Sequence, residues 1–141
     1  MPGIITDLGC DQELKAYLNN DFPAVKDLTI KLYTNDYTPV DTSIPADFTE
    51  ATGGGYVSKT MTNGSWVITP ANDPSDAIYP ELIWTFTGPL TGNPSIYGYF
   101  IVDDNNTLIF AEKFAVARTP VNNGDQLKLT VKVKLSKGTP S

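Results

Sequence analysis

The feature that most constrains the fold is the strict alternation of apolar and polar side chains over residues 126–135. The apolar positions are Leu127, Leu129, Val131, Val133 and Leu135. The polar positions between them are Lys128, Thr130, Lys132 and Lys134. Successive side chains of a β-strand point to opposite faces, so this period of two predicts a strand with one face in the core and one in water.

Further strand candidates precede this segment. Residues 28–33 alternate in the same way, with Leu28, Ile30 and Leu32 on one face. The others, separated by turns rich in Asn, Asp, Gly and Pro, are residues 56–61, 65–69, 81–87, 96–102 and 107–117. Residues 103–106, Asp-Asp-Asn-Asn, predict the turn of a hairpin. We therefore expect an all-β protein: an antiparallel β-sandwich or jelly roll of about seven to eight strands.

The N-terminal segment has a different pattern. Asp7 is a candidate helix cap, and Leu14, Tyr17 and Leu18 follow at helical spacing before Pro23. The sequence thus predicts a short N-terminal helix or arm, and these three apolar residues either bind a partner or cap an open end of the sandwich.

The predicted organisation has three parts and one long connection. We expect an N-terminal arm over residues 1–27, a sandwich domain over 28–135 and a C-terminal tail over 136–141. Residues 34–52 are polar and contain two prolines, which predicts an excursion over the surface. Connections of this length are often functional.

Composition excludes several function classes. Charged residues make up only 18% of the chain and the net charge is −6, which argues against a protein that binds nucleic-acid phosphates. No run approaches the roughly 20 apolar residues that span a bilayer, so no membrane segment is expected. Cys10 is the sole cysteine and predicts no internal disulfide. We expect synthesis in a cytoplasm.

Catalysis is not indicated. The chain has no histidine, which removes the commonest general base and metal ligand, and one cysteine cannot form a thiolate zinc site. Four carboxylates remain as candidates for a glycosidase-like pair: Glu81, Asp103, Asp104 and Glu112. Asp103, Asp104 and Asn106 could alternatively hold calcium, but they are also ordinary turn residues. We predict no catalytic, metal or cofactor site.

Three other features admit two interpretations each. The triplet 53–55, Gly-Gly-Gly, lacks the following helix of a phosphate cradle and is better explained as the connection to a strand. The aromatic residues, including Trp66 and Trp84, could line a sugar-binding groove, but core packing is favoured. Lys128, Lys132 and Lys134 either protect a sheet edge or dock on an acidic partner.

Several segments taken together resemble small structural proteins of tailed bacteriophages. The matching segments are Leu-Thr-Ile-Lys-Leu-Tyr-Thr-Asn-Asp-Tyr-Thr-Pro at 28–39, Asp-Phe-Thr-Glu-Ala-Thr-Gly-Gly-Gly-Tyr at 47–56, Ile-Tyr-Gly-Tyr-Phe at 96–100 and Ala-Glu-Lys-Phe at 111–114. The resemblance covers about residues 28–135 and is moderately specific as a set.

The resemblance implies a noncatalytic virion component. Such proteins commonly decorate or cement a capsid, often as trimers, and others belong to tails or baseplates. We expect a capsid cement protein on the capsid surface that self-associates, as a homotrimer, and binds the major capsid protein. The alternative is a receptor-binding or carbohydrate-binding β module of a tail or baseplate. A glycan-cleaving enzyme would require two carboxylates in one cleft.

Overall fold

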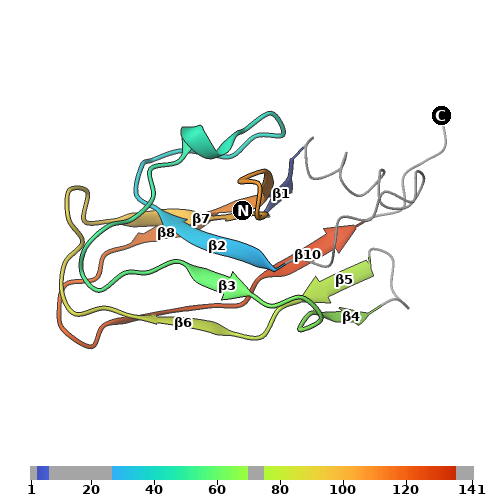
Figure 1. The fold of residues 1–141 in the computed structure, drawn as a ribbon. Helices are drawn as coiled ribbons and strands as arrows, with labels where there is room; N and C mark the ends of the chain where they lie inside the picture. The colour runs from blue at the N-terminus through green and yellow to red at the C-terminus, as the bar shows by residue number, and fades with distance from the viewer. Residues whose placement is uncertain (1–2, 7–26, 70–74, 136–141) are drawn as a thin grey trace.

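The computed structural model describes residues 3–6, 27–69 and 75–135. The prediction of an all-β antiparallel sandwich is confirmed, because every strand pairing between described residues is antiparallel and the sheets form two layers (Figure 1). The predicted helix, with Leu14, Tyr17 and Leu18, lies outside the described residues, as does the predicted tail 136–141. The single described helix is the 3-10 turn Pro45–Asp47.

The upper layer is a five-stranded sheet in the order β1-β8-β7-β2-β3. Its strands are β1 (Ile4–Ile5), β8 (Leu108–Arg118), β7 (Ile96–Val102), β2 (Leu28–Tyr33) and β3 (Lys59–Met61). The predicted hairpin at its centre is confirmed, since β7 pairs with β8 and the chain turns at residues 103–106. β1 lies within the predicted arm, and it pairs with β8 at Phe110 and Ala111.

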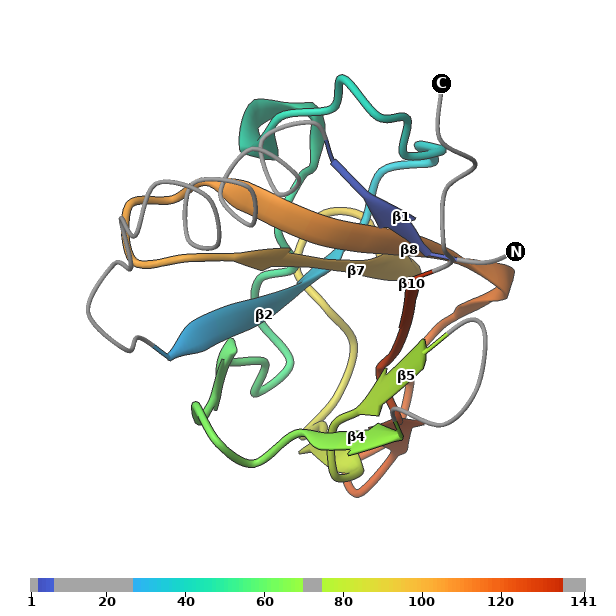
Figure 2. The same cartoon turned by 90° about the vertical axis from the view of Figure 1, so that its right-hand side faces the viewer.

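The lower layer contains two smaller sheets. β4 and β5, of one of them, lie below the upper sheet in Figure 2. One has the order β10-β5-β4 and the other is β6-β9. Their strands are β4 (Val67–Thr69), β5 (Ser75–Ile78), β6 (Leu82–Thr85), β9 (Gln126–Leu129) and β10 (Lys132–Leu135). The structure therefore has ten described strands, more than the seven to eight that we expected.

The two lower sheets are one bent ribbon interrupted by a bulge. Ile78 pairs with Lys132 and Leu82 with Leu129, so three residues (79–81) lie opposite two (130–131). Pro80 has no amide hydrogen for the ladder, which accounts for the break. The amide of Tyr79 still donates to the carbonyl of Val131 at 3.0 Å across the bulge. The single strand predicted over 126–135 is therefore divided into β9 and β10.

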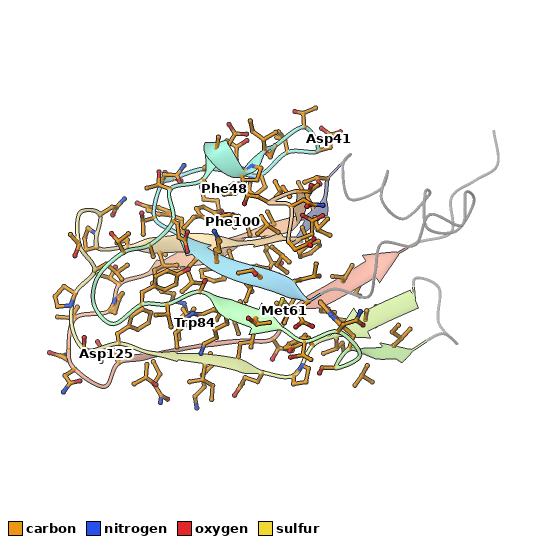
Figure 3. The ribbon with its side chains drawn as sticks, in the orientation of Figure 1. Asp41, Phe48, Met61, Trp84, Phe100 and Asp125 are labelled. Carbon is orange, nitrogen blue, oxygen red and sulfur yellow. The ribbon has the colours of Figure 1, made fainter. Side chains whose placement is uncertain are left out.

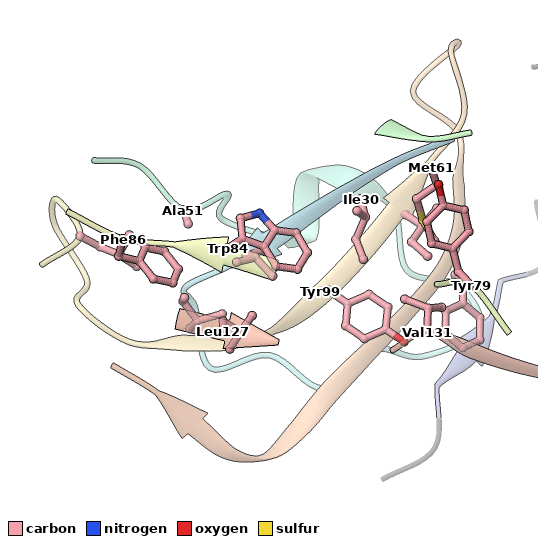
Figure 4. Close-up of a cluster of buried hydrophobic side chains, with 14 residues drawn as sticks. Ile30, Ala51, Met61, Tyr79, Trp84, Phe86, Tyr99, Leu127 and Val131 are labelled. Atoms are coloured by element: carbon pink, nitrogen blue, oxygen red, sulfur yellow. The ribbon is translucent and has the colours of Figure 1, made fainter. Parts of the chain in front are cut away.

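The main core lies between the layers, where side chains of β2 and β7 meet those of the lower ribbon (Figure 4). Trp84 and Leu127 reach this core from β6 and β9, and Ile30 and Tyr99 from the upper sheet. The predicted alternation of the last strand is confirmed, because Leu127 and Val131 are buried whereas Lys128 and Lys132 are exposed.

A second core lies on the outer face of the five-stranded sheet. Tyr33 and Phe100 point to this face, and Phe48 covers them from the loop between β2 and β3 (Figure 3). The neck of the loop is closed by two backbone bonds, from Thr34 to the carbonyl of Thr49 at 2.8 Å and from Ala51 to that of Leu32 at 2.9 Å. The upper sheet is thus buried on both faces, which explains the nearly continuous apolar run of β7.

Candidate interaction surface

Two of the carboxylates considered for catalysis, Asp103 in the turn and Glu112 on β8, have structural partners. Asp103 Oδ1 accepts the amides of Asn105 at 2.9 Å and Thr107 at 2.8 Å, and Asn106 adopts the left-handed conformation with φ 60°. These bonds are those of an Asx turn. Glu81 is exposed and precedes β6 in the lower layer, whereas Glu112 is on β8 in the upper sheet. No group of three His, Cys, Asp or Glu among the described residues could hold a metal ion.

The pKa of the Glu112 carboxyl is set by its surroundings on β8. Desolvation by burial raises its pKa above the ordinary value of 4.5, although hydrogen bonds from the Tyr99 hydroxyl and the Gly3 amide favour the ionised form. The same carboxylate raises the pKa of Tyr99, whose shift is caused mainly by burial. The pair joins β1, β7 and β8, so its contribution is to strand packing.

The aromatic side chains proposed for sugar stacking are mostly in the core. Trp84 is only 2% exposed, and its indole Nε1 donates to the carbonyl of Val57 at 2.9 Å. Trp66 is half-buried and packs edge-on against Tyr79, with ring centroids 5.3 Å apart. The core interpretation is therefore confirmed for Trp84, and Trp66 also contacts the core.

The glycine triplet lies where its loop packs closely against residues 87–89. Gly53, Gly54 and Gly55 all have positive φ, and a Cβ on Gly54 would lie 2.7 Å from the carbonyl oxygen of Gly88. The amide of Thr87 donates to the carbonyl of Gly54 at 2.9 Å, which joins the two loops. The triplet is thus required by backbone packing.

The three predicted partner-binding lysines have different surroundings. Lys132 Nζ lies 3.2 Å from Asp76 Oδ2 on β5, so its charge is paired within the sheet. Lys134 is exposed on β10. Lys128 borders a cavity between β8 and β9. The three lysines therefore differ in their surroundings, and all three lie on edge strands of the described sheets.

The cavity beside Lys128 is a feature that the sequence did not predict. It measures about 610 Å³ and extends from the end of β8 across the loop that leads to β9. A second cavity of about 320 Å³ lies between β8 and β9 and shares Arg118, Leu127 and Lys128 with the first. We call the two together the β8–β9 groove. Arg118 directly follows the predicted strand 107–117, but only the strand order places it beside Lys128.

Exposed apolar side chains also occur on the edge strand of the three-stranded sheet. Val67 and Ile68, on the edge strand β4, are 63% and 65% exposed. Adjacent strand residues point to opposite faces, so both faces of this short edge are apolar and uncovered. Uncovered apolar residues on an edge strand are typical of sites where another chain binds.

No protein-family model and no curated protein matches this chain. No helix within the described ranges is long and apolar enough to cross a bilayer.

Proposed function

We propose that this chain is a noncatalytic virion structural protein of a tailed phage, and specifically a decoration or cement protein that binds the major capsid protein and stabilises the capsid lattice. The resemblance of residues 28–135 to such proteins is the origin of the proposal. The proposed location is the capsid surface, and the proposed assembly is a homotrimer.

The observation that carries the proposal is a β-sandwich with a well-packed core and with edge strands that no other described strand covers. One sheet is buried on both faces, which makes the body rigid. At the margins, β4 presents Val67 and Ile68 to solvent, and β9 pairs with only one of the described strands. A cement protein needs such a body and such margins, because it must bind neighbours without rearranging.

The chemistry of the described carboxylates also supports a noncatalytic role. Asp103 and Asp125 each accept two backbone amides in their own turns. Asp36 and Glu50 form ion pairs with Lys113 and Lys31. Carboxylates held in this way stabilise loops and sheets.

Modest contacts suffice for this function. A protein that binds a preassembled lattice at several points gains from effective concentration, since each attachment makes the next one intramolecular. We therefore expect weak binding to an isolated capsid subunit and retention on intact shells.

The test is cryo-electron microscopy of virions from the phage that encodes this chain, combined with light scattering of the purified protein. Density for the sandwich at the three-fold positions of the shell, and a trimer in solution, are the expected results. Density confined to the tail or baseplate would replace the cement proposal with the receptor- or carbohydrate-binding module. Absence from the particle would reject both structural roles.

A further inference from the structure

Within residues 3–6, 27–69 and 75–135, the upper and lower layers each end in an unpaired strand edge on the same side of the molecule. β1 pairs with β8 only at Phe110 and Ala111, so no described strand lies beside residues 112–118 on that side. β9 pairs with β6 alone among the described strands. Both edges border the β8–β9 groove, with Phe114 and Val116 on one side and Leu129 on the other.

β8 bends where it borders this groove. Gly98 pairs with Lys113 and Ile96 with Arg118, so four residues of β8 (114–117) lie opposite Tyr97 alone. Such bulges bend a strand and re-aim its side chains, and they are over-represented beside functional sites. Here the bend leaves Val116 71% exposed at the groove.

Apolar side chains line the part of the groove that lies between β8 and β9. Leu127 is buried in the main core, and Phe114 and Leu129 pack against that core while still lining the groove. A strand lying between β8 and β9 could therefore direct alternate side chains onto an apolar surface.

Two basic residues of the groove have no bonded partner. Arg118 and Lys128 line both cavities and have no ion-pair partner in the described part of the chain. The other charged lining residues are bonded within the protein. Lys113 pairs with Asp36, Glu112 accepts hydrogen bonds from the Tyr99 hydroxyl and the Gly3 amide, and Asp125 accepts the amides of Val121 at 2.8 Å and Asn122 at 2.9 Å. Carboxylates are therefore the side chains that would pair with Arg118 and Lys128.

We infer that the β8–β9 groove binds an extended segment of another protein, which adds as a strand between β8 and β9 and places acidic side chains beside Arg118 and Lys128. Its alternate, apolar side chains cover Phe114, Leu127 and Leu129. Main-chain hydrogen bonds to the two open edges supply affinity, and the alternating side chains supply specificity, as in other cases of strand addition.

Geometry decides against a second copy as the occupant. An edge strand of a folded copy is already paired on one side, so its main chain could bond to only one of the two open edges. An extended segment that belongs to no sheet can bond to both. That this segment belongs to a neighbouring virion protein rests on the proposed function, whereas the groove and the chemistry of its ligand do not.

The test uses the full chain and a fluorescein-labelled nine-residue peptide of alternating glutamate and valine, with fluorescence anisotropy as the measurement. We expect saturable binding that weakens with salt, and much weaker binding of the matched lysine–valine peptide. The double variant Arg118→Gln with Lys128→Gln should weaken binding by about tenfold or more. The control Lys134→Glu lowers the net charge by the same two units outside the groove and should leave binding unchanged.

A second peptide separates strand addition from attraction between charges alone. Methylation of alternate backbone amides removes hydrogen-bond donors but keeps the glutamates, so it should abolish binding. Retained binding of the methylated peptide, or equal losses in the groove and control variants, would overturn the inference. So would a dimer in sedimentation that dissociates in the groove variant, with no peptide binding, since the groove would then belong to a second copy. Each result is independent of where the protein is found on virions.

Discussion

The ring of Phe48 stacks on the ring of Phe100, with centroids 4.7 Å apart and planes inclined by 12°. Phe48 also contacts Tyr33 edge-on at 4.9 Å, so one loop side chain closes an aromatic cluster on the outer face of the upper sheet. Because the neck of the loop is bonded to β2, this contact holds the loop as a cover on the sheet.

Replacing Phe48 with alanine should lower the free energy of unfolding by about 3–5 kcal/mol, because it leaves a cavity above Tyr33 and Phe100. Urea denaturation followed by tryptophan fluorescence measures the loss. Val40→Ala is the matched control in the same loop, since Val40 is 47% exposed and its truncation should cost less than about 0.5 kcal/mol. Equal losses in the two variants would show that the loop does not cover the sheet.

Gly98 should tolerate no side chain. A Cβ at this position would lie 2.1 Å from the carbonyl oxygen of Glu112 and 2.6 Å from the hydroxyl of Tyr33. Gly98→Ala should therefore destabilise the protein by about 3 kcal/mol or prevent folding, because the strand partner must move. Gly88→Ala is the control, since a Cβ there meets nothing within 4 Å. A thermal melt that is unchanged by Gly98→Ala would contradict the close approach of β7 and β8.

Local sequence patterns predicted the strands whose own side chains alternate or form the central hairpin. The period of two over residues 126–135 identified the buried and exposed faces correctly, and the Asx-rich segment 103–106 identified the turn between β7 and β8. These signals depend only on neighbours in the sequence, so no knowledge of the strand order was needed.

The missed strands depend on distant partners. β1 has two residues, and β5, with the sequence Ser-Asp-Ala-Ile, has no alternation strong enough to identify it. Each is a strand because it pairs with a segment far along the chain, β8 or β10. The covering role of residues 34–52 was missed for a similar reason: the signal was one aromatic residue, Phe48, within a polar loop.

The same limit applies to the β8–β9 groove. The alternation with apolar residues indicates Lys128, Lys132 and Lys134 equally, but Lys132 is paired with Asp76 and only Lys128 lines the groove. Arg118 was not singled out at all. Only the strand order places Arg118 beside Lys128, and strand order cannot be deduced from alternation.

The hydroxyl of Tyr56 connects three segments of the chain. It should contribute more to the free energy of unfolding than the neighbouring ion pair of Lys31 with Glu50. It accepts the amide of Leu32 at 3.0 Å and donates to Glu50 Oε1 at 3.1 Å. Tyr56→Phe leaves the Leu32 amide without its acceptor, so we expect a loss of about 1–3 kcal/mol in urea denaturation. Lys31→Met removes the partly exposed pair of Lys31 with Glu50 and should cost about 1 kcal/mol or less. A larger loss of stability in Lys31→Met than in Tyr56→Phe would contradict the role given to the Tyr56 hydroxyl.

The partly buried carboxyl of Glu112 should make stability depend on pH in a direction opposite to that of a salt-bridged acid. Its pKa is raised on folding, so the native state binds more protons than the unfolded state between the ordinary value of 4.5 and the raised value. The stability contributed by the protonated form is complete below this window and is lost as the pH rises through it. Glu112→Gln should remove this part of the pH dependence, which urea midpoints measured from pH 4.5 to 7.5 would reveal.

A second variant identifies the hydrogen bond that moderates this shift. The Tyr99 hydroxyl lowers the pKa of Glu112 by bonding to its ionised form, and Phe retains the shape of the ring. In Tyr99→Phe the loss of stability should therefore begin at the same pH, set by the unfolded chain, and continue to a higher pH than in the unsubstituted protein. Comparison with the double variant Tyr99→Phe with Glu112→Gln isolates the coupling between the two residues. A window that ends at the same pH with and without the hydroxyl would mean that Tyr99 does not bond to this carboxylate in solution, and that burial alone sets its pKa.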